Sequence, residues 1–139
     1  MKTSNVNERS MLIESAMRAI NGRVFKYGDF DCHIFAADIA LTYTDVDYAK
    51  PFRGTYSDAR GAQAIVDQHG GSVAFVTELV GKDPQPVFHA RVGDVMAYRV
   101  NDKKIATGIC IGARAVFLGL NGGFEFRALD ECLCSWKVE

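Results

Sequence analysis

A cysteine in a turn that leads into an apolar helix is the feature of this sequence with the clearest chemistry. Asp29 and Asp31 precede Cys32, and Phe35 and Ala36 follow it at the spacing of a helix. A cysteine in the first turn of a helix lies beside unpaired N–H groups and the positive end of the helix dipole, which can lower its pKa from about 8.5 to between roughly 3.5 and 7.5. This placement predicts a catalytic nucleophile or the remnant of one. The alternative is a small buried residue in a helix whose start is capped by Asp29 or Asp31.

The segments that must position this cysteine are helices first and strands afterwards. Apolar spacing and stop signals such as Asn21-Gly22 predict helices over residues 7–20, from 32 to 41 or 43, over 58–68 with Ser57 as N-cap, and a short one through 79 with Ser72 as N-cap. Strand patterns follow at 95–100, 105–111, 115–119, 124–127 and 134–138, with turns that make two hairpins. This order predicts an α+β domain.

Length and composition narrow the classes of protein. The chain has 139 residues and a formal net charge of −1, which favours a single domain over residues 1–139 and gives no reason to expect a nucleic-acid partner. The first ten residues lack the apolar core of a signal peptide, and no later run is long enough for a membrane span. We therefore expect synthesis in the cytoplasm of the host cell.

The cysteines do not form a metal-binding pattern. Cys132 and Cys134 make a C-x-C pair rather than the C-x-x-C of structural zinc sites, and a cytosolic chain is kept reduced. We expect Cys110, Cys132 and Cys134 to be buried thiols, and we expect no metal and no cofactor.

Five short motifs follow one another along the chain. They are Tyr27-Gly28 with Asp31-Cys32, Arg53-Gly54, Gly93-Asp94-Val95, Gly108-Ile109-Cys110-Ile111-Gly112 and Ser135-Trp136-Lys137-Val138. Their order and spacing resemble the NlpC/p60 superfamily of cysteine peptidases, and more closely a small phage- and prophage-encoded branch of it. The resemblance covers residues 27–138, so that residues 1–22 form an added N-terminal helix. It implies a papain-like fold, with N-terminal helices packed on a C-terminal antiparallel β-sheet.

The resemblance also implies a catalytic arrangement that this chain does not complete. It places Cys32 at the nucleophile and Ala106, or Thr107 with a slip of one residue, at the histidine that takes the thiol proton. The strand expected to orient that histidine, residues 115–118, has no polar side chain. Because alanine cannot accept a proton, we expect a degenerate site.

Another histidine could replace the missing base. His33 follows Cys32 directly, and on a helix its side chain would point roughly 100° away. His69 lies at a predicted helix end. His89 leads into the Gly93-Asp94 segment, which passes near the groove in this superfamily, and it is our candidate for a relocated base.

Four further residues are expected to line the site. Asp31 serves as an N-cap or orients donors, and Arg53 clamps a carboxylate or pairs with a nearby aspartate. Asp94 and Ala106 follow from the resemblance. Asp38, on the central helix, is expected to be solvated or salt-bridged.

Two functions are therefore open. The first, which we prefer, is a structural component of a phage or prophage tail, at its tip or in its assembly, whose partners are other tail proteins and which is carried in the virion. The second is an active thiol hydrolase acting on peptidoglycan or another acyl substrate, with Cys32 as nucleophile and a relocated histidine as base.

Overall fold

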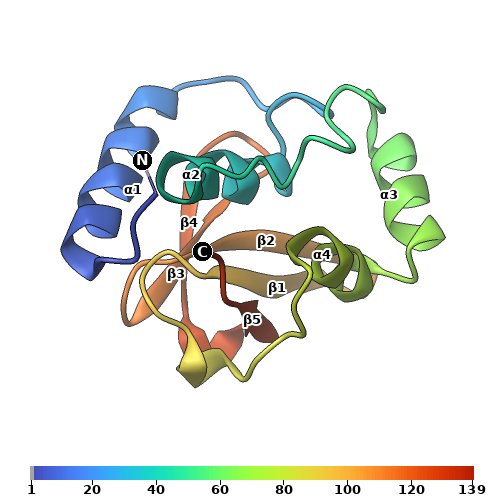
Figure 1. The fold of residues 1–139 in the computed structure, drawn as a ribbon. Helices are drawn as coiled ribbons and strands as arrows, with labels where there is room; N and C mark the ends of the chain where they lie inside the picture. The colour runs from blue at the N-terminus through green and yellow to red at the C-terminus, as the bar shows by residue number, and fades with distance from the viewer. Residues whose placement is uncertain (1) are drawn as a thin grey trace.

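The structure, a computed structural model, describes residues 2–139 and confirms the α+β class (Figure 1). Helices occupy the first part of the chain, and strands with two short 3-10 helices occupy the rest. In chain order the elements are α1 (Val6–Ile20), α2 (Ile34–Thr44), α3 (Ala59–Gln68), α4 (Ser72–Val80), η1 (Val87–His89), β1 (Val95–Asn101), β2 (Lys104–Cys110), β3 (Arg114–Leu118), β4 (Phe124–Ala128), η2 (Leu129–Glu131) and β5 (Cys134–Trp136).

The strands form one antiparallel sheet in the order β4-β3-β2-β1-β5. Both predicted hairpins are confirmed, and β5 returns to pair with the outer edge of β1, where Val95 lies opposite Trp136. The pairing of β2 with β3 includes only Gly108, Ile109 and Cys110 of β2. The first residues of β2 therefore have no neighbour in β3, and this uncovered part of the sheet lies against the start of α2.

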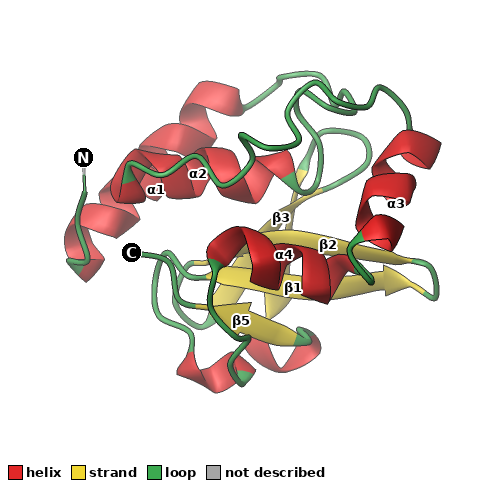
Figure 2. Ribbon diagram, turned by 45° about the vertical axis from the view of Figure 1, so that its right-hand side comes forward, coloured by secondary structure: helices red, strands yellow, loops and turns green. Residues whose placement is uncertain are grey.

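Alternate residues of the strands point to opposite faces of the sheet, as the period of a strand requires. Val95, Ile109 and Val116 belong to the main core together with α2, and α4 lies over the same side in front of β1 and β2 (Figure 2). Met96, Ala106 and similar residues of the other face form a second cluster with residues around η1 and η2. The sheet is thus covered on both faces.

Helix α2 is the central element of the main core. Phe35, Ile39, Ala40 and Tyr43 are all buried, and alanine at positions facing other elements allows close packing. The helix is apolar on most of its surface because α1 packs on one side and β2 and β3 on another. An amphipathic pattern is therefore weak in α2, although a helix there was predicted.

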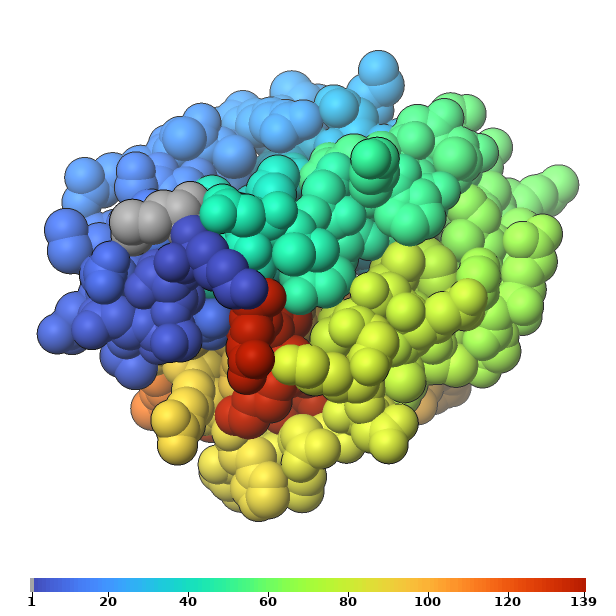
Figure 3. Space-filling view, viewed as in Figure 1, coloured from blue at the N-terminus to red at the C-terminus, as the bar shows by residue number. Residues whose placement is uncertain are grey.

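The two ends of the chain meet at Arg9 of α1. Its buried guanidinium donates to the carbonyl oxygens of Thr3 and Val138, each at 2.8 Å, and lies 4.0 Å from a carboxylate oxygen of Asp94. The same side chain stacks on the ring of Tyr43. Figure 3 shows the C-terminal residues between the N-terminal segment and the surface of the later helices.

Two predicted helix caps were wrong by one residue. Asp58, not Ser57, caps α3, because the Asp58 side chain accepts the N–H of Gly61 at 2.7 Å. Gly71 is the N-cap of α4, and Ser72 is its first residue. Neither change alters the path of the chain, because both helices begin within one residue of the prediction.

Within residues 2–139, no helix combines the length and the apolar character that crossing a membrane would require.

Candidate functional site

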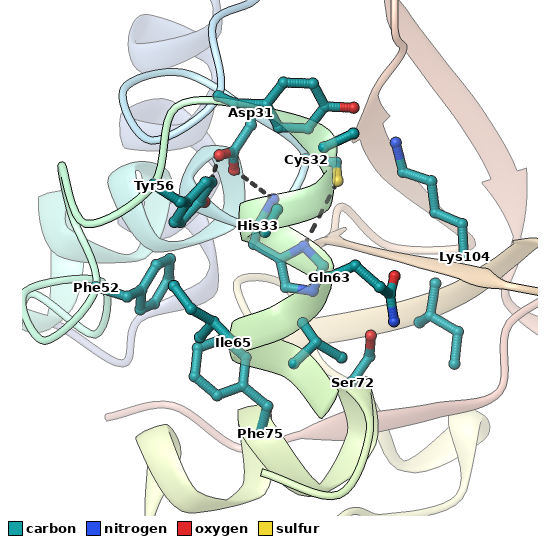
Figure 4. Close-up of a pocket in the computed structure, with 15 residues that line it drawn as sticks. Asp31, Cys32, His33, Phe52, Tyr56, Gln63, Ile65, Ser72, Phe75 and Lys104 are labelled. Atoms are coloured by element: carbon teal, nitrogen blue, oxygen red, sulfur yellow. Dashed lines mark hydrogen bonds between the residues drawn. The ribbon is translucent and has the colours of Figure 1, made fainter. Parts of the chain in front are cut away.

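A cavity of about 100 Å³ lies beside Cys32 (Figure 4). Its walls come from the turn before α2, the loop before α3, helix α3, the start of α4 and the start of β2. The described residues that line it include Asp31, Cys32, His33, Tyr56, Gln63, Phe75 and Lys104. Segments far apart in the sequence therefore meet at the cysteine.

The carboxylate of Asp31 binds the N–H groups at the start of α2, although the N-cap position itself is held by His33. Asp31 Oδ1 accepts the N–H groups of His33 at 3.1 Å and Ile34 at 3.0 Å, and Asp31 Oδ2 accepts the N–H of Gly28 at 2.9 Å and the Tyr56 hydroxyl. Burial raises the pKa of Tyr56, and its hydrogen bond to Asp31 raises it further. The N–H groups at the start of the helix are thus used by a carboxylate and are not directed at the sulfur of Cys32.

Cys32 does not have the low pKa that its position predicts. The residue is only 6 % exposed, and burial raises its pKa to about 11, against a smaller opposing effect from Lys104. The prediction failed mainly because the thiol is buried; in addition, Asp31 takes the helix donors and its negative charge disfavours the thiolate. At neutral pH Cys32 is a protonated thiol.

The position expected for the catalytic histidine holds no base. Ala106 is buried in the same cluster as Cys32. Its neighbour Thr107 donates its hydroxyl to the carbonyl oxygen of Cys32 at 3.1 Å. Thr107 therefore contacts the Cys32 segment, Ala106 shares a buried cluster with Cys32, and neither residue has an imidazole. The next strand in the sequence, β3, is apolar from Ala115 to Leu118 and offers no polar side chain that could orient a catalytic histidine.

His33 was predicted to point away from Cys32, and this was wrong. Its Nδ1 lies 3.5 Å from the Cys32 sulfur. Helix α2 begins at Ile34, so Cys32 and His33 lie in the turn that precedes it, whereas the prediction had placed both on the helix. Burial lowers the pKa of His33, the carboxylate of Asp31 opposes this effect, and the charge of Lys104 lowers the pKa further. The imidazole is therefore neutral at neutral pH.

The structure does not bring His89 to Cys32. His89 is exposed at the end of η1. It lines a separate hollow together with Asp94, Arg91 and Lys137, and this hollow shares no residue with the cavity at Cys32. Asp94 is buried there, accepting the N–H of Arg91 at 2.9 Å and the ammonium of Lys137 at 2.8 Å. His69 pairs with Glu78 instead.

Arg53 also does not line the cavity. Its guanidinium binds Asp38 and Asp47, at 3.0 Å from an oxygen of Asp47, which is the ion-pair role that the sequence left open. Hydrogen bonding to Arg53 lowers the pKa of Asp47, whereas burial raises that of Asp38. This network fixes the loop that carries Phe52 and Tyr56 to the cavity.

Sequence reasoning missed two polar residues of the cavity, Lys104 and Gln63. Lys104 starts β2, and its ammonium lies 5.9 Å from the centre of the Tyr27 ring. Gln63 comes from α3. The Asn101–Lys104 turn predicted a hairpin, but it did not show whether Lys103 or Lys104 faces the cavity. That depends on the first residues of β2, which are not paired with β3.

Cys110 and Cys132 are buried free thiols, as predicted, while Cys134 is half-buried. Among the described residues, no group of three or more His, Cys, Asp or Glu side chains is placed to hold a metal ion.

Comparison with known proteins assigns a family. A model of a domain of unknown function, DUF6950, matches residues 4–138, so the chain belongs to the DUF6950 family. No curated protein and no solved structure matches the chain.

Proposed function

We propose that this member of the DUF6950 family is a non-catalytic, NlpC/p60-like domain that serves as a component of a phage or prophage tail. The proposal joins the sequence resemblance to what surrounds Cys32. The cysteine, the helix that follows it and the antiparallel sheet are kept, but the chemistry that would ionise the thiol is missing.

The observation that carries the proposal is the environment of the thiol. A nucleophilic cysteine needs a thiolate, or a base that generates one as it attacks. Here burial holds the Cys32 pKa at about 11, and Thr107 uses its hydroxyl on the Cys32 backbone. Such a residue behaves as a small core side chain. The domain would then act through its surfaces and its cavity.

Mass spectrometry of purified particles tests the tail assignment. In a strain that produces the phage or prophage encoding this chain, we expect its peptides in purified tails or in tail-assembly intermediates, in a fixed ratio to a known tail protein. A ribosomal protein from the same lysate serves as the control for contamination. Absence from both particles and intermediates would remove the structural role.

One observation favours a second candidate, an active thiol hydrolase. The 3.5 Å contact between the Cys32 sulfur and His33 Nδ1 is close to the reach that a general base requires. In that mechanism His33 would take the thiol proton while the sulfur attacks an amide carbonyl. The proton would pass to the leaving amine, and water would hydrolyse the resulting thioester.

The pH profile of Cys32 alkylation separates the two candidates. With a pKa of about 11, the thiolate fraction at pH 7 is on the order of 10⁻⁴, about 300-fold below that of a free cysteine with a pKa of about 8.5. We expect the iodoacetamide rate at Cys32, followed by peptide mass spectrometry, to rise with pH up to at least pH 10. The half-buried Cys134 is the internal comparison. A plateau below pH 8 would favour the hydrolase.

A further inference from the structure

The inference concerns the cavity at Cys32 and does not depend on whether the chain is part of a phage tail. The contact between the Cys32 sulfur and His33 Nδ1 decides which nitrogen of the imidazole carries the proton. The thiol is protonated and can donate its hydrogen, and the nearest ring atom is Nδ1 of His33 at 3.5 Å. If Nδ1 of a neutral imidazole accepts, the ring proton must lie on Nε2.

That second nitrogen has no partner. Nε2 of His33 is buried and makes no hydrogen bond to any described residue. Buried polar groups in folded proteins are almost always paired. The His33 ring lines the cavity, below Cys32 and beside Gln63 in the view of Figure 4. The unpaired N–H therefore calls for an acceptor that enters the cavity.

The other polar side chains of the wall favour an anion. Lys104 contributes an ammonium, and Gln63 contributes an amide whose nitrogen also donates to Asp67 at 2.8 Å. The single carboxylate among the described lining residues, that of Asp31, already accepts from three N–H groups and the Tyr56 hydroxyl. The cavity thus offers donors and a positive charge without a free negative charge to oppose them.

The volume of the cavity and its apolar lining indicate which kind of anion it can bind. A volume of about 100 Å³ admits a group of a few non-hydrogen atoms, since a water molecule occupies about 30 Å³ in the liquid. Apolar side chains line another part of the wall, among them the aromatic rings of Phe52 and Phe75 and the aliphatic side chain of Val66. A short apolar chain that ends in a planar carboxylate fits both the apolar side chains and the donors of His33 and Lys104.

We propose that this cavity binds a carboxylate, with Nε2 of His33 and the ammonium of Lys104 as its donors. The carboxylate comes from a small free acid or from the C-terminus of a peptide, and both present the same chemistry to the site. The thiol of Cys32 forms part of the wall and undergoes no reaction in this role.

The test uses the full chain with propionate, and the ring ¹⁵N resonances of His33 report on binding. We expect saturable binding with a dissociation constant on the order of 1–10 mM, within the limit for so small a ligand. Lys104→Met should weaken it about tenfold. Lys103→Met, which changes the exposed neighbouring lysine of the same turn, should leave it unchanged.

Further probes distinguish the source of the carboxylate and can overturn the proposal. N-acetyl-alanyl-alanine binding as well as propionate would identify a peptide C-terminus, whereas binding of propionate alone would identify a free acid. Equal binding of propionamide, no saturation with either acid, or the same loss in Lys103→Met and Lys104→Met would refute the site. His33→Leu should abolish binding, and if that variant does not fold, the shift of the wild-type His33 Nε2 resonance decides.

Discussion

Burial and the carboxylate of Asp31 together explain why a cysteine before a helix is not activated in this protein. The carboxylate takes the first N–H groups of α2 through Oδ1 and fixes the loop around Gly28 and Tyr56 through Oδ2. The same charge disfavours a thiolate at Cys32. Asp31 therefore builds the site, and its charge adds to the burial that keeps the sulfur protonated.

His33 gives the turn a pH dependence that can be measured. Its pKa in the folded chain is lowered by burial below the usual value of about 6.5. The unfolded chain then binds a proton that the folded chain does not, so the contribution of His33 to stability is present above about pH 6.5 and is lost as the pH falls below it.

Urea unfolding at several pH values between 7.5 and 5 should therefore show a fall in the free energy of unfolding, with a slope of up to about 1.4 kcal/mol per pH unit from this group. His33→Leu should flatten the slope, and His89→Leu, at an exposed position, should not. Equal slopes in wild type and His33→Leu would show that His33 is not buried in the neutral form.

At the scale of elements, the site depends on a close approach between the turn before α2 and the loop before α3. Gly28 has a φ of +83°, and its carbonyl oxygen accepts the N–H of Gly54 at 2.9 Å. A Cβ on Gly28 would lie 2.1 Å from the carbonyl oxygen of Tyr56. Only glycine allows the two segments to meet here.

Gly28→Ala should therefore be more destabilising than Gly22→Ala. Gly22 has nearly the same φ, +84°, but a Cβ there meets nothing within 4 Å. Both substitutions carry the strain of a positive φ, so the difference between them reports the clash, which we expect to cost at least about 2 kcal/mol in thermal or urea unfolding. Equal costs would mean that the two segments are not in contact.

The same elements show how far the sequence could predict the structure. Periodicity and turn residues locate all four helices and both hairpins, because those signals are local. The pairing of β5 with β1 and the short overlap of β2 with β3 are not local, and they decide which residues meet Cys32. Asp31 was predicted at the site because it adjoins Cys32 in the sequence. The non-local contacts explain the errors: His89 and Asp94 were expected at the site and lie elsewhere, and Lys104 was missed.

At the scale of the whole molecule, α1 is part of the domain and not an appendage. Arg9 connects it to the C-terminal strand region through Val138 and to the buried Asp94. The α1 helix and the end of the chain should therefore unfold together with the sheet.

Arg9→Met should lower the free energy of unfolding by about 3 kcal/mol, because it leaves buried carbonyl oxygens and a buried carboxylate with fewer partners. The matched control on the same helix is Arg18→Met. Arg18 makes an exposed pair with Glu14, and such pairs are worth at most a few tenths of a kcal/mol. Denaturant unfolding of both variants measures the difference, and equal effects would place α1 outside the cooperative unit.

The proposed function requires that the domain act without thiol chemistry, and one measurement tests this directly. Cys32→Ala is introduced into the gene for this chain in the phage or prophage proposed to encode it, and infectious particles are counted beside wild type and a deletion of the gene. We expect the variant to give close to the wild-type titre, because the thiol at this site is protonated and buried. A variant protein that folds and enters particles, but whose titre is as low as that of the deletion, would contradict the account and identify Cys32 as a nucleophile.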